Sequence, residues 1–409
     1  MPAAKGDTKH GSDARMLVSV SALHFINDLH PTLLPTFLPE IERRLSLSLG
    51  EAGFLSALFG VLNIVVQPFA GHIADRLDRP ALALCAPLLT AGGAYLLPIA
   101  PSYGAALLIV SMIGFGTASF HPQGHGLTGI AGGRGHLGSY LAVFSAAGAL
   151  GAALSPLYGV FLLKKLGPPL MPFAIFLVLA VVLVARCGLP RRFVDEERLS
   201  AKQTGDGRGA AGDGKASGGF FRVFMVCLPI ILISIIRDST SQGIRVFLPL
   251  LVTGRGGSIE FGGTLLFAFS VSGAVSSLMG GRMADLFGKR LLIFAMLAIS
   301  PLLLFPAVVT RSASSVVLFV LGGACLAATN SVTLAMAQEY VPESRSTASS
   351  LVMGLSWGIA NAVAFPIGKL GDAIGLESAL CVVSFLPLLA VAAMVFGDAR
   401  RRLRTLRGR

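Results

Sequence analysis

The sequence contains few charged residues: Asp, Glu, Lys and Arg make up 13% of its 409 positions, whereas 54% are apolar. Soluble domains carry about 25% charged residues, so this composition excludes a soluble enzyme. The five cysteines occur singly, without a C-x-x-C pair, which indicates neither a disulfide framework nor a zinc site. No G-x-x-x-x-G-K-S/T segment is present, so no ATP-binding loop is indicated. We therefore expect a membrane protein without metal or cofactor.

The net charge of +12 does not indicate nucleic-acid binding. The basic residues lie in loops and tails between apolar runs, where they orient a protein in the membrane. Most of the 33 Lys and Arg residues fall on one side if both termini are cytoplasmic. The first 15 residues are polar and lead into an apolar stretch without a small-residue cleavage site, which predicts an uncleaved first span.

Twelve apolar runs are long enough to cross a bilayer, which takes about 20 residues. They form two sets of six, near residues 16–39, 51–74, 81–99, 105–128, 137–162 and 170–188, and then 223–252, 261–284, 291–309, 314–337, 347–368 and 378–397. Between the sets lies a segment rich in Gly and charged residues, whose composition predicts a mobile linker. The predicted domains are a six-helix bundle at 1–188, a cytoplasmic linker at 189–221, and a second bundle with a basic cytoplasmic tail at 222–409.

The two halves share residues at a constant offset of 210. The matched pairs are Phe37-Leu38-Pro39 with Phe247-Leu248-Pro249, Asp28 with Asp238, Phe59 with Phe269, Gly71 with Gly281, Asp75 with Asp285, and Pro156 with Pro366. Duplicated six-helix halves place a substrate site near the bilayer midplane, where the halves meet. The repeat therefore predicts two pseudo-symmetric bundles that rock around a shared site.

A repeated loop motif carries a family resemblance. GHIADRLDRP follows the second span and GRMADLFGKR follows the eighth, and both resemble the G-x-x-x-D-R-x-G-R-R signature of the major facilitator superfamily. The residues concerned are Gly71, Asp75, Arg76, Arg79, Gly281, Asp285, Gly288, Lys289 and Arg290. The glycine allows close helix approach, and the carboxylate can cap the dipole of a helix from the other half. The alternative explanation of the motif is that its charged residues only set the orientation of the spans in the membrane.

Four further segments narrow the resemblance. Gly151, Pro156 and Gly159 in the fifth span are similar to the G-x-x-x-G-P-x-x-G motif of the superfamily's antiporters. The segments SALHFIND, GFGTASFHP and AQEYVP resemble the fosmidomycin-resistance branch of drug efflux permeases. That branch carries His-Pro-Glu in the fourth span, where this chain has Gln123. The resemblance implies proton-driven export across a bacterial cytoplasmic (inner) membrane.

Ionisable groups within the spans are costly and need a reason to persist. Asp28 lies near the middle of the first span beside Asn27, and His24 is one turn earlier on the same face. We expect a proton carrier or a fixed hydrogen-bonded helix contact here. In the seventh span, Asp238, Gln242 and Arg245 form a polar stripe, with Arg237 on the adjacent face.

Arg237 is expected either to anchor an anion through its bidentate guanidinium or to pair internally with Asp28 or Asp238. Arg245 lies nearer the outer end and is expected to snorkel. Pro122 is expected to disrupt the fourth span beside His121.

The predicted site residues fall into two groups. Those expected to bind substrate are Arg237, Asn27, His121, Gln123, Asn330, Gln338, Trp357 and Asn361, and those expected to couple protons are Asp28, His24, Asp238 and Glu339. For His121 and Trp357, simple packing is the alternative. The sequence thus predicts a monomeric secondary transporter for a small solute, anionic or drug-like, working by proton-coupled efflux. The alternative is a proton-coupled symporter that imports an organic anion such as a monocarboxylate or phosphonate.

Overall fold

The described part of the chain is almost entirely helical. The computed structural model describes residues 5–74, 76–77, 79–191, 216–312 and 314–396, and no strand is present within these ranges. Eleven helical segments among them are long and apolar enough to cross a membrane. The predicted all-helical polytopic fold is confirmed. The predicted linker and basic tail lie largely outside the described residues.

The helices follow the predicted spans. The long elements are α1 (Lys5–Leu29), α2 (Leu34–Leu45), α3 (Leu49–Ala74), α4 (Ala81–Leu96), α5 (Tyr103–Lys165), α7 (Ile175–Gly188), α9 (Ala216–Gly254), α10 (Ile259–Phe287), α11 (Lys289–Val309), α12 (Ser314–Ala328), α13 (Asn330–Tyr340), α15 (Ser356–Ile374) and α16 (Leu376–Phe385). The short elements are η1 (Pro31–Leu33), η2 (Leu97–Ile99), α6 (Gly167–Leu170), η3 (Met171–Ala174), η4 (Pro342–Ser344), α14 (Arg345–Ser350) and the π-helical turn η5 (Leu351–Leu355).

The first predicted span, 16–39, is interrupted between α1 and α2. Pro31 has no N–H with which to continue the helical ladder. Thr32 instead donates its hydroxyl to the carbonyl oxygen of Asp28 at 2.9 Å, which satisfies one of the freed groups. Polar side chains keep α1 out of the eleven strongly apolar segments, although it packs along α5 and α7 as a span would.

α5 turns back on itself and supplies two spans, Tyr103–Gly132 and Ser139–Lys165. A straight helix would separate Phe120 and Phe144 by about 36 Å, whereas their ring centroids are 6.3 Å apart. The helical assignment continues through Pro122, so the expected break there is wrong. Neighbouring helices can support the freed backbone around a membrane proline.

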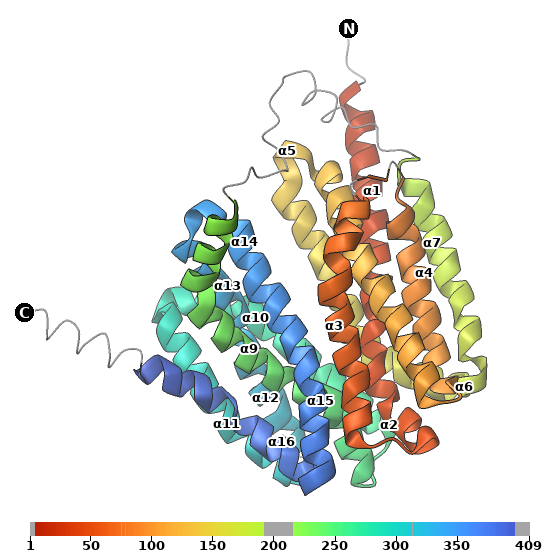
Figure 1. The fold of residues 1–409 in the computed structure, drawn as a ribbon. Coiled ribbons are helices and arrows are strands. Elements are labelled where there is room, and N and C mark those ends of the chain that lie inside the picture. Colours follow the sequence, from red (N-terminus) through yellow and green to blue (C-terminus); the bar gives the residue numbers. More distant parts are fainter. Residues whose placement is uncertain (1–4, 75, 78, 192–215, 313, 397–409) are drawn as a thin grey trace, which may run out of the picture.

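The helices form two groups, with α1 to α7 in one and α9 to α16 in the other (Figure 1). α3 and α15 lie side by side along the seam between the groups. Their backbones approach closely at small residues: a Cβ on Gly53 would lie 2.3 Å from the carbonyl oxygen of Ala364, and one on Gly368 would lie 2.1 Å from that of Leu49. Small residues permit this kind of contact between membrane helices.

The seam is closed at the end of the molecule away from the N-terminus (Figure 1). Here Asp372, at the end of α15, accepts hydrogen bonds from the backbone N–H groups of Leu49 at 2.7 Å and Gly50 at 2.9 Å. The carboxylate therefore caps the first turn of α3 from the opposite half. Lys164 and Glu260 add an exposed ion pair at 2.9 Å between α5 and α10.

Toward the N-terminal end, the contacts between α3 and α15 stop. A contact near this end joins Ile64 of α3 to Gly358 of α15. The same face of α3 continues with Gln67 and Pro68, which are both exposed. On the other half, a Cβ on Gly354 would meet nothing within 4 Å. The two halves are therefore joined at one end and parted at the other.

Candidate functional site

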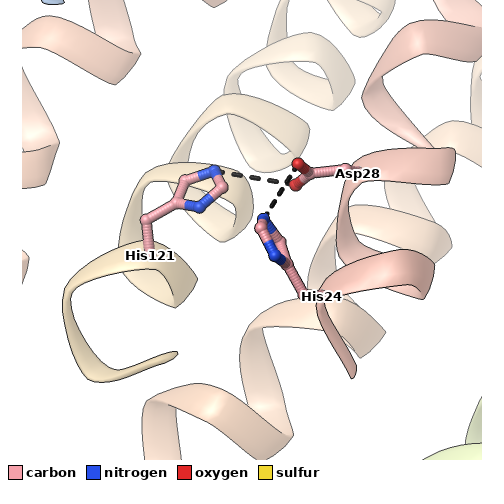
Figure 2. A group of neighbouring side chains, drawn as sticks. All are labelled: His24, Asp28 and His121. Carbon is pink, nitrogen blue, oxygen red and sulfur yellow. Dashed lines mark ion pairs between the residues drawn. The ribbon is translucent and has the colours of Figure 1, made fainter. Parts of the chain in front are cut away.

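Two imidazoles and a carboxylate meet within the first half (Figure 2). The Asp28 carboxylate lies 3.0 Å from Nε2 of His24 and 3.6 Å from Nε2 of His121. His24 and Asp28 share a face of α1, as their spacing predicts, and α5 brings in His121. The side chains of Asp28 and His121 keep exposures of 22% and 21%, so water can reach the cluster. The three donor atoms lie within 4.8 Å of one another, a spacing that could also hold a metal ion, which the sequence analysis does not expect.

The hydrogen-bond partners of His24 define how many protons the cluster holds. Nδ1 lies 2.8 Å from the carbonyl oxygen of Phe144, which can only accept, so Nδ1 must carry a hydrogen. Nε2 faces a carboxylate oxygen of Asp28. A neutral His24 beside an ionised Asp28 would therefore place two acceptors in contact. The contact becomes a hydrogen bond when one additional proton lies on this pair, on either the imidazole or the carboxylate.

His30 provides a contrast within the same helix bundle. Its Nδ1 lies 2.6 Å from the carbonyl oxygen of Ile26, and its Nε2 lies 2.8 Å from the hydroxyl of Tyr95, which can donate. The Tyr95 hydroxyl is 2.7 Å from that of Tyr158. A neutral imidazole satisfies this chain completely, so His30 needs no additional proton. No sequence pattern indicates this chain of hydrogen bonds, because its members lie far apart along the sequence.

Aromatic rings and an amide hold the cluster in place. The ring of His24 stacks on Phe144 with centroids 4.0 Å apart and lies 5.6 Å from Phe120. Asn27 donates to Asp28 at 3.1 Å and is fully buried, so it supports the carboxylate. His125, the other titratable group nearby, packs edge-on against Phe144 at 5.0 Å.

Gly148 packs directly against this cluster. A Cβ there would lie 2.5 Å from Nε2 of His24 and 2.8 Å from an oxygen of Asp28. We expect Gly148→Ala to displace His24 and to lower the free energy of unfolding by about 1–3 kcal/mol, measured by thermal unfolding in detergent. The matched control is Gly126→Ala on the same helix, where a Cβ meets nothing within 4 Å. Equal unfolding temperatures for the two variants would contradict this packing.

A cavity of about 260 Å³ lies in the second half, between α9, α10, α12 and α13. Its charged wall residues are Arg237, Asp238 and Arg245, and its polar ones include Ser241, Ser270, Ser277 and Asn330. Asp238 matches Asp28 at the repeat offset of 210. The cavity therefore occupies the position in the second half that the imidazole and carboxylate cluster occupies in the first.

Arg237 pairs internally, one of the two possibilities that its sequence leaves open. Its Nε and Nη2 donate to the two oxygens of Asp238, each at 2.9 Å, and its Nη1 donates to Thr333 at 3.0 Å. Arg245 does not snorkel, contrary to expectation. Its Nη1 donates to Ser270 at 2.9 Å, and its guanidinium lies 5.6 Å from the centroid of Phe269. No carboxylate among the described residues forms an ion pair with Arg245.

Two of the predicted substrate-binding residues, Asn361 and Trp357, lie at or beside the seam. Gln242 donates to Asn361 at 2.9 Å, and Asn361 donates to the carbonyl oxygen of Trp357 at 2.9 Å. The Trp357 ring packs edge-on against Phe59 of the other half, with centroids 5.8 Å apart. A Cβ on Gly60 would lie 2.2 Å from that of Asn361. Asn361 and Trp357 therefore connect the two halves near the end of the contact between α3 and α15.

Gln123 and two other predicted residues lie away from both sites. Gln123 is buried, accepts from the backbone N–H of Ala83 at 2.8 Å and donates to the carbonyl oxygen of Arg79 at 3.0 Å. Its amide therefore holds the first motif loop against α4 and α5. Gln338 donates to Ser349 at 2.8 Å, and Glu339 forms an exposed ion pair with Lys289. The structure does not bring Glu339 to the cluster of His24, Asp28 and His121.

The repeated motif loops lie at the parted end. Asp75 is outside the described residues, and Gly71 packs against Pro122 at van der Waals distance. Asp285 is exposed and caps no described helix of the other half. The other motif positions, Arg76, Arg79, Gly281, Gly288, Lys289 and Arg290, belong to the same two loops or the helix ends beside them. The capping expected of Asp285 is thus absent in this conformation, in which Asp372 caps α3 at the closed end.

The fifth-span motif allows close helix packing. A Cβ on Gly151 would lie 2.2 Å from the carbonyl oxygen of Phe25 on α1, and one on Gly159 would lie 3.0 Å from Leu33. The carbonyl oxygen of Pro156 faces Gly263 of the other half. These residues therefore position the second span of α5 against both α1 and α10.

Two six-span groups with buried ionisable groups in each define the class of secondary transporters. The chain belongs to the Major Facilitator Superfamily, whose sequence profile matches residues 20–235 and 230–409. It is 28% identical to the uncharacterized MFS-type transporter YfnC of Bacillus subtilis (strain 168) over 93% of this chain and 92% of that protein. It is 25% identical to the fosmidomycin resistance protein of Escherichia coli (strain K12) over 98% of this chain and 97% of that protein.

Solved structures share the same fold. A bacterial homologue of the human lysosomal transporter Spinster, in an inward-facing and occupied conformation, matches with a TM-score of 0.76 and 14% identity, over 94% of this chain and 96% of that one. The nucleoside transporter NupG matches with a TM-score of 0.72 and 13% identity, over 93% of this chain and 98% of that one. The expected major facilitator fold and family resemblance are confirmed.

Proposed function

We propose that this protein is a proton-coupled exporter of a small solute in a bacterial cytoplasmic (inner) membrane. It works as a monomeric antiporter with both termini in the cytoplasm. Protons move inward down their gradient while the solute moves outward, and the two halves rock around the buried groups.

The observation that carries this proposal is the 3.0 Å contact between Nε2 of His24 and the Asp28 carboxylate, which is satisfied by one additional proton on the pair. A carboxylate and an imidazole that hold a proton within a span, yet remain partly exposed, have the properties of a proton carrier. Loss of the proton would leave two acceptors in contact at 3.0 Å, which would disfavour the present arrangement. Proton release is thereby linked to a change of conformation.

The conformation fits an exporter that has just received its proton. With the N-terminus in the cytoplasm, the parted end of the seam faces the cytoplasm and the closed end faces outward. The cluster would then discharge its proton inward, and a solute from the cytoplasm could enter between the halves. The name of the fosmidomycin resistance protein supports export as the direction.

Import of an organic anion by proton symport is the second candidate. Arg245 favours it, because this cation in the second-half cavity has no paired carboxylate among the described residues. Gln123 also favours it, since the efflux branch has glutamate at that position. Both candidates use the proton on His24 and Asp28 and differ in the direction of solute movement.

Reconstitution into proteoliposomes that contain a pH-sensitive dye tests the proposal. Fosmidomycin or methylphosphonate loaded inside should leave the vesicles with proton movement in the opposite direction, which the dye reports. Protein-free liposomes provide the control. Solute movement without any proton movement would overturn proton coupling, and proton movement in the same direction as the solute would favour the symporter.

A further inference from the structure

The second-half cavity carries an excess positive charge. Arg237 and Asp238 form a bidentate pair and neutralise each other. Arg245 therefore contributes a net charge of about +1 to the cavity wall. A guanidinium has five N–H donors, and only Nη1 of Arg245 has a hydrogen-bond acceptor among the described residues, the hydroxyl of Ser270.

The wall around Arg245 is arranged to hold it in one orientation. Ser270 accepts its hydrogen bond, and the Phe269 ring lies under the guanidinium at 5.6 Å. A fixed, planar guanidinium with unused donors binds an oxyanion group through two parallel hydrogen bonds. Ser241, Ser277 and Asn330 provide further polar groups on the same wall.

We propose that this cavity is the binding site for a small organic monoanion, held by Arg245 through a terminal carboxylate or phosphonate group. This inference rests on the proposed transport function and specifies its substrate class. A monoanion would bring the cavity to neutrality, whereas a dianion would leave an uncompensated negative charge at membrane depth.

The volume sets an upper limit on the solute. Pockets for drug-sized ligands span about 300–1,000 Å³, whereas this cavity has about 260 Å³. Small residues at Gly273, Ala274 and Ala327 leave that space open. The site therefore suits a compact acid of a few heavy atoms.

Isothermal titration calorimetry on the full chain in phosphatidylcholine nanodiscs tests the site. The probes are L-lactate and methylphosphonate, with lactamide as the neutral analogue of lactate and malonate as the dianion. We expect lactate and methylphosphonate to bind and lactamide and malonate to bind more weakly. Arg245→Gln should weaken lactate binding by about tenfold or more, the loss expected for a charge-assisted hydrogen bond.

Further variants separate loss of binding from loss of folding. Gly273→Leu leaves every charge in place but fills the cavity, and it should also abolish lactate binding. Arg255→Gln is the matched control, because Arg255 pairs with Glu377 at the closed end, away from the cavity. Unchanged lactate affinity in Arg245→Gln, or equal binding of lactamide and lactate, would overturn the proposal. Displacement of lactate by phosphatidylglycerol in the nanodisc would overturn it in favour of a lipid headgroup.

The binding assay also distinguishes this inference from the proposed function. Lactate binding needs no proton gradient and should persist in Asp28→Asn. If proton-coupled transport does not depend on Arg245, the anion site is contradicted and the proposed exporter function stands. If lactate binds at Arg245 but no proton-coupled transport occurs, the anion site stands and the proposed exporter function is contradicted.

Discussion

Asp28→Asn is expected to abolish solute movement driven by a pH gradient while leaving solute binding intact. The amide of an asparagine can donate to Nε2 of His24, where the structure requires a hydrogen, and it has nearly the same shape as the carboxylate. The variant therefore resembles the proton-loaded pair but cannot release the proton. Gradient-driven transport should fall to the level of protein-free vesicles.

The control for this experiment is Glu40→Gln, which removes a carboxylate from an ion pair with Arg43 on α2, outside the cluster. It should preserve both gradient-driven transport and solute binding. Gradient-driven transport that continues unchanged in Asp28→Asn would exclude Asp28 as the proton carrier. Loss of solute binding together with gradient-driven transport would indicate a structural role for the carboxylate.

Asp372→Asn is expected to shift the protein away from the conformation described here. The carboxylate accepts from the N–H groups of Leu49 and Gly50 across the seam, and this contact exists only while that end is closed. Asparagine keeps only one acceptor oxygen for these two N–H groups, and a lost hydrogen bond costs about 0.5–1.5 kcal/mol, which corresponds to about a two- to thirteenfold change in the ratio of the two conformations. The ratio is measurable as the rate at which a cysteine at Ser48 reacts with a membrane-impermeant thiol reagent.

A second carboxylate near the same end provides the comparison. Glu260 forms an exposed ion pair with Lys164 across the halves, and exposed ion pairs contribute little to stability. Glu260→Gln should therefore change the reaction rate at position 48 much less than Asp372→Asn. An equal effect of the two variants would contradict the assignment of Asp372 as the principal polar contact that closes this end.

The sequence predicts the architecture well because membrane spans have a strong local signal. Apolar runs of about 20 residues mark each crossing, and the repeat at Asp28 and Asp238 indicates two related halves. The pairing of His24 with Asp28 was also predictable, since residues four apart share a helix face. The first span is incompletely predicted, because Pro31 divides it.

Tertiary contacts decide the rest of the site. His121 joins Asp28 only because α5 folds back beside α1. Arg237 has a similar local pattern to Arg245, and its pairing with Asp238 depends on side-chain geometry that spacing does not specify. Gln123 supports the loop at Arg79 through backbone groups of Arg79 and Ala83. These groups belong to another segment of the chain, so sequence spacing does not predict the contact. No local pattern distinguishes these outcomes.

The two halves keep the repeat but differ in chemistry. Asp28 in the first half contacts His24, while the equivalent Asp238 neutralises Arg237 beside the cavity. His24 corresponds to Ser234, which cannot hold a proton in this way. After duplication and divergence, the first half would therefore bind the proton and the second half would bind the solute.

The most direct test of the account measures the closed end as a function of pH. Spin labels on cysteines at the exposed positions Lys165 and Ser258, in a chain whose native cysteines are replaced, report the distance across that end by double electron–electron resonance. Raising the pH removes the proton from His24 and Asp28 and brings two acceptors into contact, so the population with the short distance should fall. In Asp28→Asn that population should not change with pH. A short-distance population that is independent of pH in the parent chain would contradict the account.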